Sequence, residues 1–184
     1  MKFLSAVIIF LTATFSVAQQ YWQQEVNYTI NVILDDERHF LHGEEQFEYV
    51  NNSPNALNEI YIHLWPNAYK NGETALAEQQ YATGETILKF EGDLDRGFID
   101  SLNFHVNDNP VEWDFDKEHI DICHIILPEP LQPGERLAVS TPFRVKIPSG
   151  EISRLGHIGQ SYQITQWYPS LLYTTRMIGI RCHI

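Results

Sequence analysis

Three residues with metal-binding side chains alternate along one stretch of the chain. His119, Asp121 and Cys123 are each two residues apart, so an extended strand places all three on the same face. Imidazole, carboxylate and thiolate groups are all zinc ligands, which makes a metal triplet one interpretation. The other interpretation, which we favour, is that these are ordinary polar positions on a strand. The sequence therefore predicts no metal site in this chain.

Two further patterns could do chemistry but lack essential parts. Asp114, Asp116 and Glu118 repeat the alternating oxygens of a calcium loop, yet the glycine and the terminal bidentate glutamate are missing, so a solvated acidic edge is expected. His39 and His42 are three residues apart across an expected turn, with no helix to align them. No H-E-x-x-H, G-x-S-x-G, glycine-rich phosphate loop or C-x-x-C occurs, and no catalytic residue is predicted.

Aromatic residues offer a different kind of site. There are four tryptophans and nine tyrosines, and exposed aromatic platforms are one way in which β-sandwiches hold sugars. The tryptophans are Trp22, Trp65, Trp113 and Trp167. The interpretation that we favour is that these rings belong to the core and rim of a sheet.

The elements that must position these residues are almost all strands. Alternating apolar and polar residues, separated by turn residues, predict strands rather than helices. We expect strands at Val26–Leu34, Leu41–Val50, Ile60–Leu64, Leu102–Val106, Val111–Phe115, His119–Leu127 and Leu137–Ile147. Leu102–Val106 and Val111–Phe115 are expected to form one hairpin around Asn107–Pro110, and Thr74–Tyr81 one short helix. The pattern predicts an all-β fold, an antiparallel β-sandwich or curved sheet.

Composition limits the class of protein. The chain has 184 residues, 12 Lys+Arg against 24 Asp+Glu and a formal charge of −12. This length suits one domain, and the negative charge argues against a nucleic-acid or anionic-membrane partner. Two cysteines are too few for a disulfide scaffold.

The first 18 residues have the features of a secretory signal peptide. Lys2 precedes the apolar stretch Phe3–Phe15, and the small residues Ser16 and Ala18 follow, so cleavage is expected after Ala18. The apolar stretch is shorter than the roughly 20 residues of a membrane span. We expect a secreted or periplasmic protein without a membrane span.

Several stretches resemble a known family. Glu59–Asn71 reads EIYIHLWPNAYKN, Leu131–Leu137 reads LQPGERL and Gly159–Pro169 reads GQSYQITQWYP. Together with the opening strand, these resemble the N-terminal domain of the aminopeptidase N family of zinc metallopeptidases, in particular exported Bacteroidetes-type members. The resemblance runs from about Tyr21 to Pro169. L-x-P-G-E alone is a weak motif, whereas the other two stretches together are specific.

The resemblance implies a fold, a site residue and a cofactor. It implies a saddle-like antiparallel β domain that leans on a separate catalytic domain, which carries H-E-x-x-H and the zinc. In this family the N-terminal domain supplies a Gln or Glu that grips the free α-amine of the peptide substrate, and the matching residue is Gln163. The zinc ligands have no counterparts here, so zinc belongs to the full-length enzyme. The chain alone is expected to bind no cofactor and to be inactive, with the catalytic domain as its missing partner.

The last 15 residues depart from the family pattern. Relatives continue after W-Y-P with K-P-A-V-Y-D, whereas Ser170–Ile184 reads SLLYTTRMIGIRCHI. One permitted codon string for this segment, read one nucleotide earlier, encodes that continuation. We therefore expect a signal peptide (1–18), an aminopeptidase N-like domain (19–169) and an out-of-frame tail (170–184). The alternative is a stand-alone secreted β-sandwich module that binds a glycan or a protein.

Overall fold

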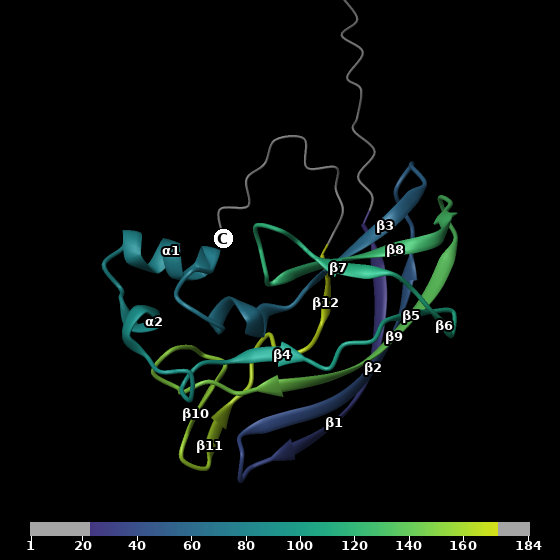
Figure 1. Ribbon diagram of the computed structural model, residues 1–184. Coiled ribbons are helices and arrows are strands. Elements are labelled where there is room, and N and C mark those ends of the chain that lie inside the picture. The colour runs from purple at the N-terminus through teal and green to yellow at the C-terminus, as the bar shows by residue number, and fades with distance from the viewer. Residues whose placement is uncertain (1–22, 173–184) are drawn as a thin grey trace, which may run out of the picture.

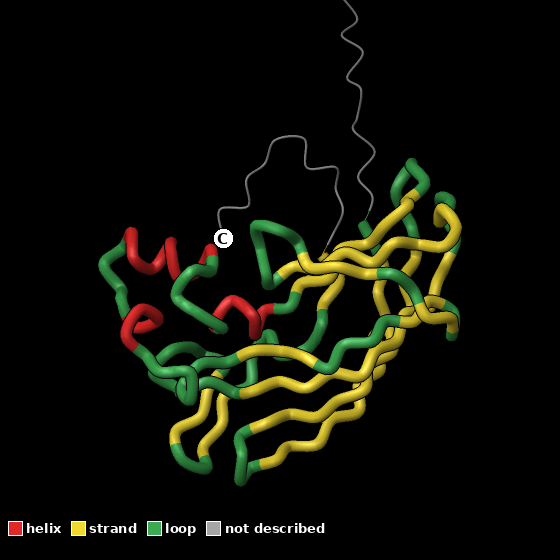
Figure 2. The backbone as a smooth tube through the Cα atoms, in the orientation of Figure 1, coloured by secondary structure: helices red, strands yellow, loops and turns green. Residues whose placement is uncertain are grey.

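The computed structural model describes residues 23–172, which fold into two antiparallel sheets and a separate two-stranded hairpin (Figures 1 and 2). The first sheet is ordered β1-β2-β9-β5-β6, and β4 also pairs with β9. Its strands are β1 (Glu25–Asp35), β2 (Phe40–Val50), β9 (Arg136–Lys146), β5 (His105–Val106), β6 (Asn109–Pro110) and β4 (Phe98–Asp100). The second sheet is ordered β12-β3-β8-β7, from β12 (Ser170–Leu172), β3 (Leu57–His63), β8 (Ile122–Leu131) and β7 (Trp113–Phe115). Strands β10 (Gly156–Ile158) and β11 (Ser161–Gln163) form the hairpin.

Alternating side chains build the first sheet. Strands β1, β2 and β9 are each 11 residues long and pair without a break in register. On β2, Phe47 and Tyr49 are buried while Glu44, Gln46 and Glu48 are exposed. The prediction of an all-β antiparallel fold is confirmed.

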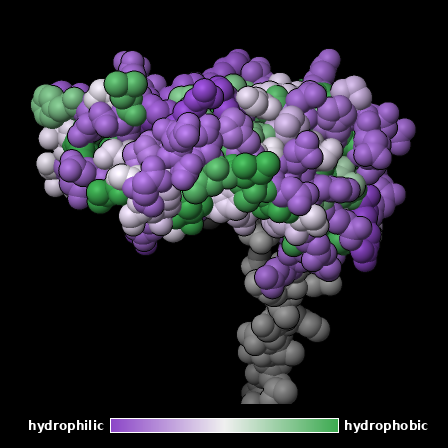
Figure 3. All heavy atoms as spheres, turned by 90° about the horizontal axis from the view of Figure 1, so that it is seen from below, coloured by the Kyte–Doolittle hydropathy of each residue, from purple (hydrophilic) through white to green (hydrophobic). Residues whose placement is uncertain are grey.

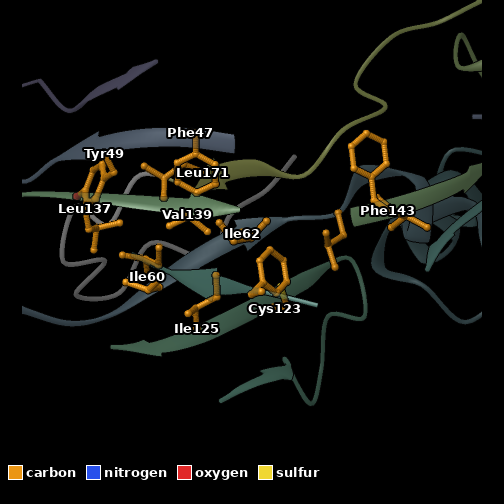
Figure 4. Close-up of a cluster of buried hydrophobic side chains, with 14 of the residues drawn as sticks. Phe47, Tyr49, Ile60, Ile62, Cys123, Ile125, Leu137, Val139, Phe143 and Leu171 are labelled. Carbon is orange, nitrogen blue, oxygen red and sulfur yellow. The ribbon is translucent and has the colours of Figure 1, made fainter. Parts of the chain in front are cut away.

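The core lies between the two sheets (Figure 4). Fully buried side chains from β2 and β9 of the first sheet meet side chains from β3 and β8 of the second. They include Phe47, Val139, Ile62, Cys123 and Ile125. Apolar burial of this kind is the main stabilising term of a β-sandwich.

Short helices cover one end of the sheets. They are η1 (Trp65–Tyr69), α1 (Ala75–Ala82) and α2 (Ile87–Phe90). Thr74 caps α1, because its Oγ1 accepts a hydrogen bond from Ala77 N at 3.2 Å and donates one to Ala68 O at 2.8 Å. The predicted helix over Thr74–Tyr81 is confirmed, whereas η1 and α2 had no periodic signal.

The predicted single hairpin over Leu102–Phe115 is wrong. Asn107 and Asp108 both have positive φ, at 49° and 65°, which makes a tight two-residue turn between β5 and β6. The chain then leaves the first sheet, and β7 pairs with β8 of the second sheet instead. At this crossover the Trp113 ring packs edge-on against the buried ring of Phe104, with centroids 5.3 Å apart. The predicted strand over His119–Leu127 likewise begins later, at Ile122, and continues to Leu131.

The ends of the chain are only partly described. Residues 1–18, where a signal peptide is predicted, lie outside the described residues, as do residues 173–184 of the predicted tail. The first three residues of that tail form β12 and pair with β3. Leu171 N also donates a hydrogen bond to the Tyr28 hydroxyl of β1, at 2.8 Å.

Candidate functional site

Gln163 lies at the end of the β10–β11 hairpin. It is exposed, and its backbone pairs with Gly156 of β10. None of the hydrogen bonds found among residues 23–172 uses its side-chain amide. A side-chain carbonyl in water can accept from an ammonium group, so this residue has the chemistry that the amine role requires.

The hairpin packs closely against the preceding chain at Gly156. A side chain there would place its Cβ 2.6 Å from Gly150 Cα and 2.8 Å from Ser153 O. Only glycine fits such a close approach of two backbone segments. Gly150 N also donates to His157 O at 2.9 Å, and His157 N donates to Pro148 O at 3.0 Å. The strand opposite Gln163 is therefore fixed to the chain that precedes it.

A second set of contacts joins the hairpin to the β1–β2 turn. The Tyr162 hydroxyl donates to Asp36 O at 3.2 Å and lies 2.7 Å from His39 Nδ1. Because a hydroxyl carries one proton, His39 Nδ1 donates to it in this arrangement. Gln160 Nε2 donates to the same Asp36 carbonyl at 3.0 Å. The position of Gln163 thus depends on residues more than 100 positions away in the sequence.

Two stacked histidines complete this corner. The rings of His39 and His157 lie with centroids 3.6 Å apart and planes 17° apart. Burial and the neighbouring His157 lower the pKa of His39, and burial raises the pKa of Tyr162. Both shifts favour the neutral forms of these two side chains, which act here as hydrogen-bonding groups beside the charges of Asp35 and Asp36.

The predicted pairs and triplets of ligand residues do not converge on an ion. Within residues 23–172, no group of three or more His, Cys, Asp or Glu side chains is arranged to hold a metal. Cys123 faces the core, and burial raises its pKa to about 12, whereas Asp121 bonds to His63 and His119 is exposed. His42, three residues from His39, is exposed on β2. The donor set described does not fit zinc.

The acidic residues that resemble a calcium loop serve local turns. Asp116 Oδ1 accepts from Glu118 N and His119 N, both at 2.9 Å, and Asp114 Oδ1 accepts from Phe115 N at 2.9 Å. Such bonds from Asp to nearby backbone groups stabilise turns. They account for these residues without a cation.

A buried acid–histidine pair lies on the second sheet. His63 Nε2 is 3.3 Å from Asp121 Oδ2, and the Trp65 ring lies against His63 with centroids 4.3 Å apart. Burial alone would raise the pKa of Asp121, but the His63 hydrogen bond and a backbone hydrogen bond hold it below its usual value. These residues are 58 positions apart, and no local pattern in the sequence predicts that they pair.

The described tryptophans do not form an exposed platform. Trp65, Trp113 and Trp167 are each half-buried, and Trp113 and Trp167 pack against the aromatic rings of Phe104 and Phe143. The interpretation that they are core and rim residues is confirmed for these three. Trp22 lies outside the described residues.

The outer face of the first sheet carries a shallow polar hollow of about 320 Å³. Residues of β1, β2 and β9 that alternate onto this face line it: Thr29, Asn31, Glu44, Gln46, Ser140 and Pro142. Glu45 and Thr141 also border it, although they are buried positions of the same strands. The lining holds no aromatic ring on which a sugar could stack.

Comparisons with known proteins add no relative. No protein-family model matches this chain, and no curated protein matches it either. Among the described residues, no helix is both long and apolar enough to cross a membrane. The functional argument therefore rests on the residues and their geometry.

Proposed function

We propose that this chain is the amine-recognising and structural N-terminal domain of an exported zinc-dependent aminopeptidase. The observation that carries the proposal is the placement of Gln163. It stands at the end of a braced hairpin, in the segment S-Y-Q-I-T-Q-W-Y-P on which the family resemblance depends, with its amide open to solvent. In this role its side-chain carbonyl accepts a hydrogen bond from the α-ammonium group of a peptide.

An exposed apolar surface supports a further domain as partner. Strand β1 is an edge of its sheet, and its residues Val32, Ile33 and Leu34 are exposed in succession, with Ile33 73% accessible. Ile158 of β10 is 72% accessible. Figure 3 shows hydrophobic residues gathered in a patch on the face seen from below, the side on which β1 lies in Figure 1. Apolar edges of this kind are usually covered by another chain or domain.

Hydrolysis itself needs groups that the described residues do not supply. The zinc in the proposed enzyme supplies Lewis-acid activation of the scissile carbonyl, and it belongs to the catalytic domain. What this chain contributes is an acceptor for the substrate amine and a rigid frame for that acceptor. We expect the purified chain with added Zn²⁺ to leave an aminoacyl anilide uncleaved, and robust turnover would refute that expectation.

The gene provides the deciding experiment. Sequencing across the Pro169 codon should reveal a continuing frame that encodes H-E-x-x-H.

In the enzyme made from that frame, Gln163→Ala should raise KM for an aminoacyl anilide at least about tenfold, because one hydrogen bond to a charged group is lost. Gln163→Glu should retain binding, and Gln46→Ala, on the outer face of β2, is the matched control. A verified stop after Ile184 with no catalytic frame downstream would contradict the proposal.

A further inference from the structure

One carboxyl group is buried in the core without a partner. Glu45 lies on the inner face of β2, paired in register with Ile30 of β1 and Thr141 of β9. Its residue surface is only 2% accessible, and within residues 23–172 neither side-chain oxygen has a hydrogen-bond partner. Burial raises the pKa of Glu45 to about 8. An acid in these surroundings keeps its proton near neutral pH.

The chain that follows Gln163 covers this part of the sheet. We call residues 164–169 the C-terminal strap. Its Trp167 ring lies 5.9 Å from the ring of Phe143, which sits over Gly43, and its Tyr168 ring lies 5.4 Å from that of Tyr28 on β1. Figure 4 shows this part of the chain running between Phe47 and Phe143.

Register places Glu45 between these two contacts. Phe143 pairs with Gly43, two residues before Glu45, and Tyr28 pairs with Phe47, two residues after it. Residues two apart on a strand share a face, so Gly43, Glu45 and Phe47 all lie on the inner face of the sheet, on which the strap's rings contact Phe143 and Tyr28. The carboxyl group therefore lies beneath the strap, between its two aromatic contacts.

Among the described neighbours, no group can neutralise a charge on Glu45. The titratable side chains in this core are the phenols of Tyr28 on β1, Tyr49 on β2 and Tyr168 on the strap and the thiol of Cys123 on β8, none of which carries a positive charge, and burial is the cause of the raised pKa of Glu45. The Thr141 hydroxyl across the strand pair already donates to Pro142 O and accepts from Asn103 N, both at 2.9 Å. A carboxylate at this position would be buried and unpaired, which is far more costly than a buried neutral acid.

We propose that Glu45 is a proton-dependent latch for the C-terminal strap. In its acid form the side chain stays in the core and the strap packs over it. When the proton leaves, the carboxylate must reach water, and the strap lifts from the sheet to let it do so. This inference stands apart from the proposed function, although the strap begins directly after Gln163.

The size of the effect follows from linkage between proton loss and opening. In the open state Glu45 has the ordinary pKa of 4.5, and in the closed state the pKa is about 8. The opening equilibrium therefore rises about tenfold per pH unit between these values and is level above pH 8.

Hydrogen exchange of the strap tests the latch. The protection of the Leu171 amide, which lies just after the strap and donates to the Tyr28 hydroxyl at 2.8 Å, is compared between the natural chain and Glu45→Gln at each pH from 5 to 8.5, so that the intrinsic pH dependence of exchange cancels. We expect the ratio of the two exchange rates to grow at least a hundredfold over this range. Glu44→Gln, on the exposed face of the same strand, should exchange like the natural chain. A ratio that stays flat, or an equal effect from Glu44→Gln, would overturn the proposal.

A second measurement needs no variant at position 45. With 5-fluorotryptophan incorporated and its Trp167 signal assigned by Trp167→Phe, the ¹⁹F resonance should titrate with a midpoint far above 4.5. No change in that resonance between pH 5 and 9 would overturn the latch. If Glu45→Gln does not fold, Glu45→Met replaces it in the exchange comparison.

Discussion

Two polar side chains near the C-terminal strap lie in opposite surroundings, one in water and one in the core. Gln163, just before the C-terminal strap, is exposed on the β10–β11 hairpin, whereas Glu45 lies buried beneath the strap. None of the described hydrogen bonds uses either side chain. In water an unused amide is available to bind, and in the core an unused carboxyl is costly.

A third side chain shows that burial alone does not decide the outcome. Asp121 is nearly as buried as Glu45, at 6% accessible, yet its pKa is lowered rather than raised. The difference is the His63 hydrogen bond together with a backbone hydrogen bond. A partner stabilises the ionised form of Asp121, and Glu45 has none.

The largest effect on the free energy of unfolding is expected at Glu45. In the folded chain its pKa is about 8, against 4.5 when exposed, so the natural chain loses stability as pH rises from 4.5 to 8. At about 1.4 kcal/mol per pH unit the loss is at most on the order of 5 kcal/mol, and it stops growing at the pH where the strap opens, because Glu45 then reaches water in the folded chain too. Glu45→Gln removes this loss, so its advantage in urea denaturation should grow from pH 4.5 to pH 8. Parallel pH profiles for the two proteins would show that Glu45 is already paired.

The contribution of Asp121 to stability should depend on pH in the opposite direction from that of Glu45. Asp121→Asn removes a charged acceptor from His63 and should cost about 1–3 kcal/mol at pH 7. Because the pKa is lowered on folding, this contribution is present above the ordinary value of 3.8 and is lost as pH falls through the folded value. Urea denaturation at pH 3 and pH 7 measures the gap, with exposed Asp114→Asn as control. A gap that widens at pH 3 would contradict the assignment.

The hydrogen bonds that Tyr162 makes from the β10–β11 hairpin should have a smaller effect on stability. Tyr162→Phe removes a hydroxyl that contacts His39 and Asp36 O, and we expect a loss of about 1 kcal/mol. Faster hydrogen exchange should be confined to β10 and β11. Tyr81→Phe is the matched control, because the Tyr81 hydroxyl is buried with no hydrogen-bond partner in the described part of the chain and its removal should cost nothing. Equal losses from both variants would mean that the Tyr162 contacts do not hold the hairpin.

The smallest effect on stability is expected at Gln163. Gln163→Ala should change the free energy of unfolding by no more than about 0.5 kcal/mol, because the side chain is exposed. Thermal and urea denaturation check this. A larger loss would mean that Gln163 supports the fold, which would weaken its assignment as a binding group.

Alternation predicted the long strands but not the tertiary pairings. The face that carries Phe47 and Tyr49 follows from a period of two, and the same period places Glu45 on that face. That inference was available from the sequence and was missed. The crossover after Asn107-Asp108 was not available, because a two-residue turn fixes the hairpin but not the sheet that β7 joins next.

The candidate site depends on contacts that no local pattern encodes. Gln163 was predicted from the family resemblance, and the structure places it on a strand of only three residues, too short for a periodic signal. The contact of Tyr162 with His39 joins residues 123 positions apart. Tertiary packing alone brings them together.

Binding of a free peptide amine to Gln163 tests the central claim most directly. The side-chain amide signal of Gln163 in a ¹⁵N NMR spectrum is followed while a short peptide is added to millimolar concentration. We predict a saturable shift with the free N-terminus and none with the same peptide acetylated at its N-terminus. Equal shifts with both peptides, or no shift with either, would contradict the account.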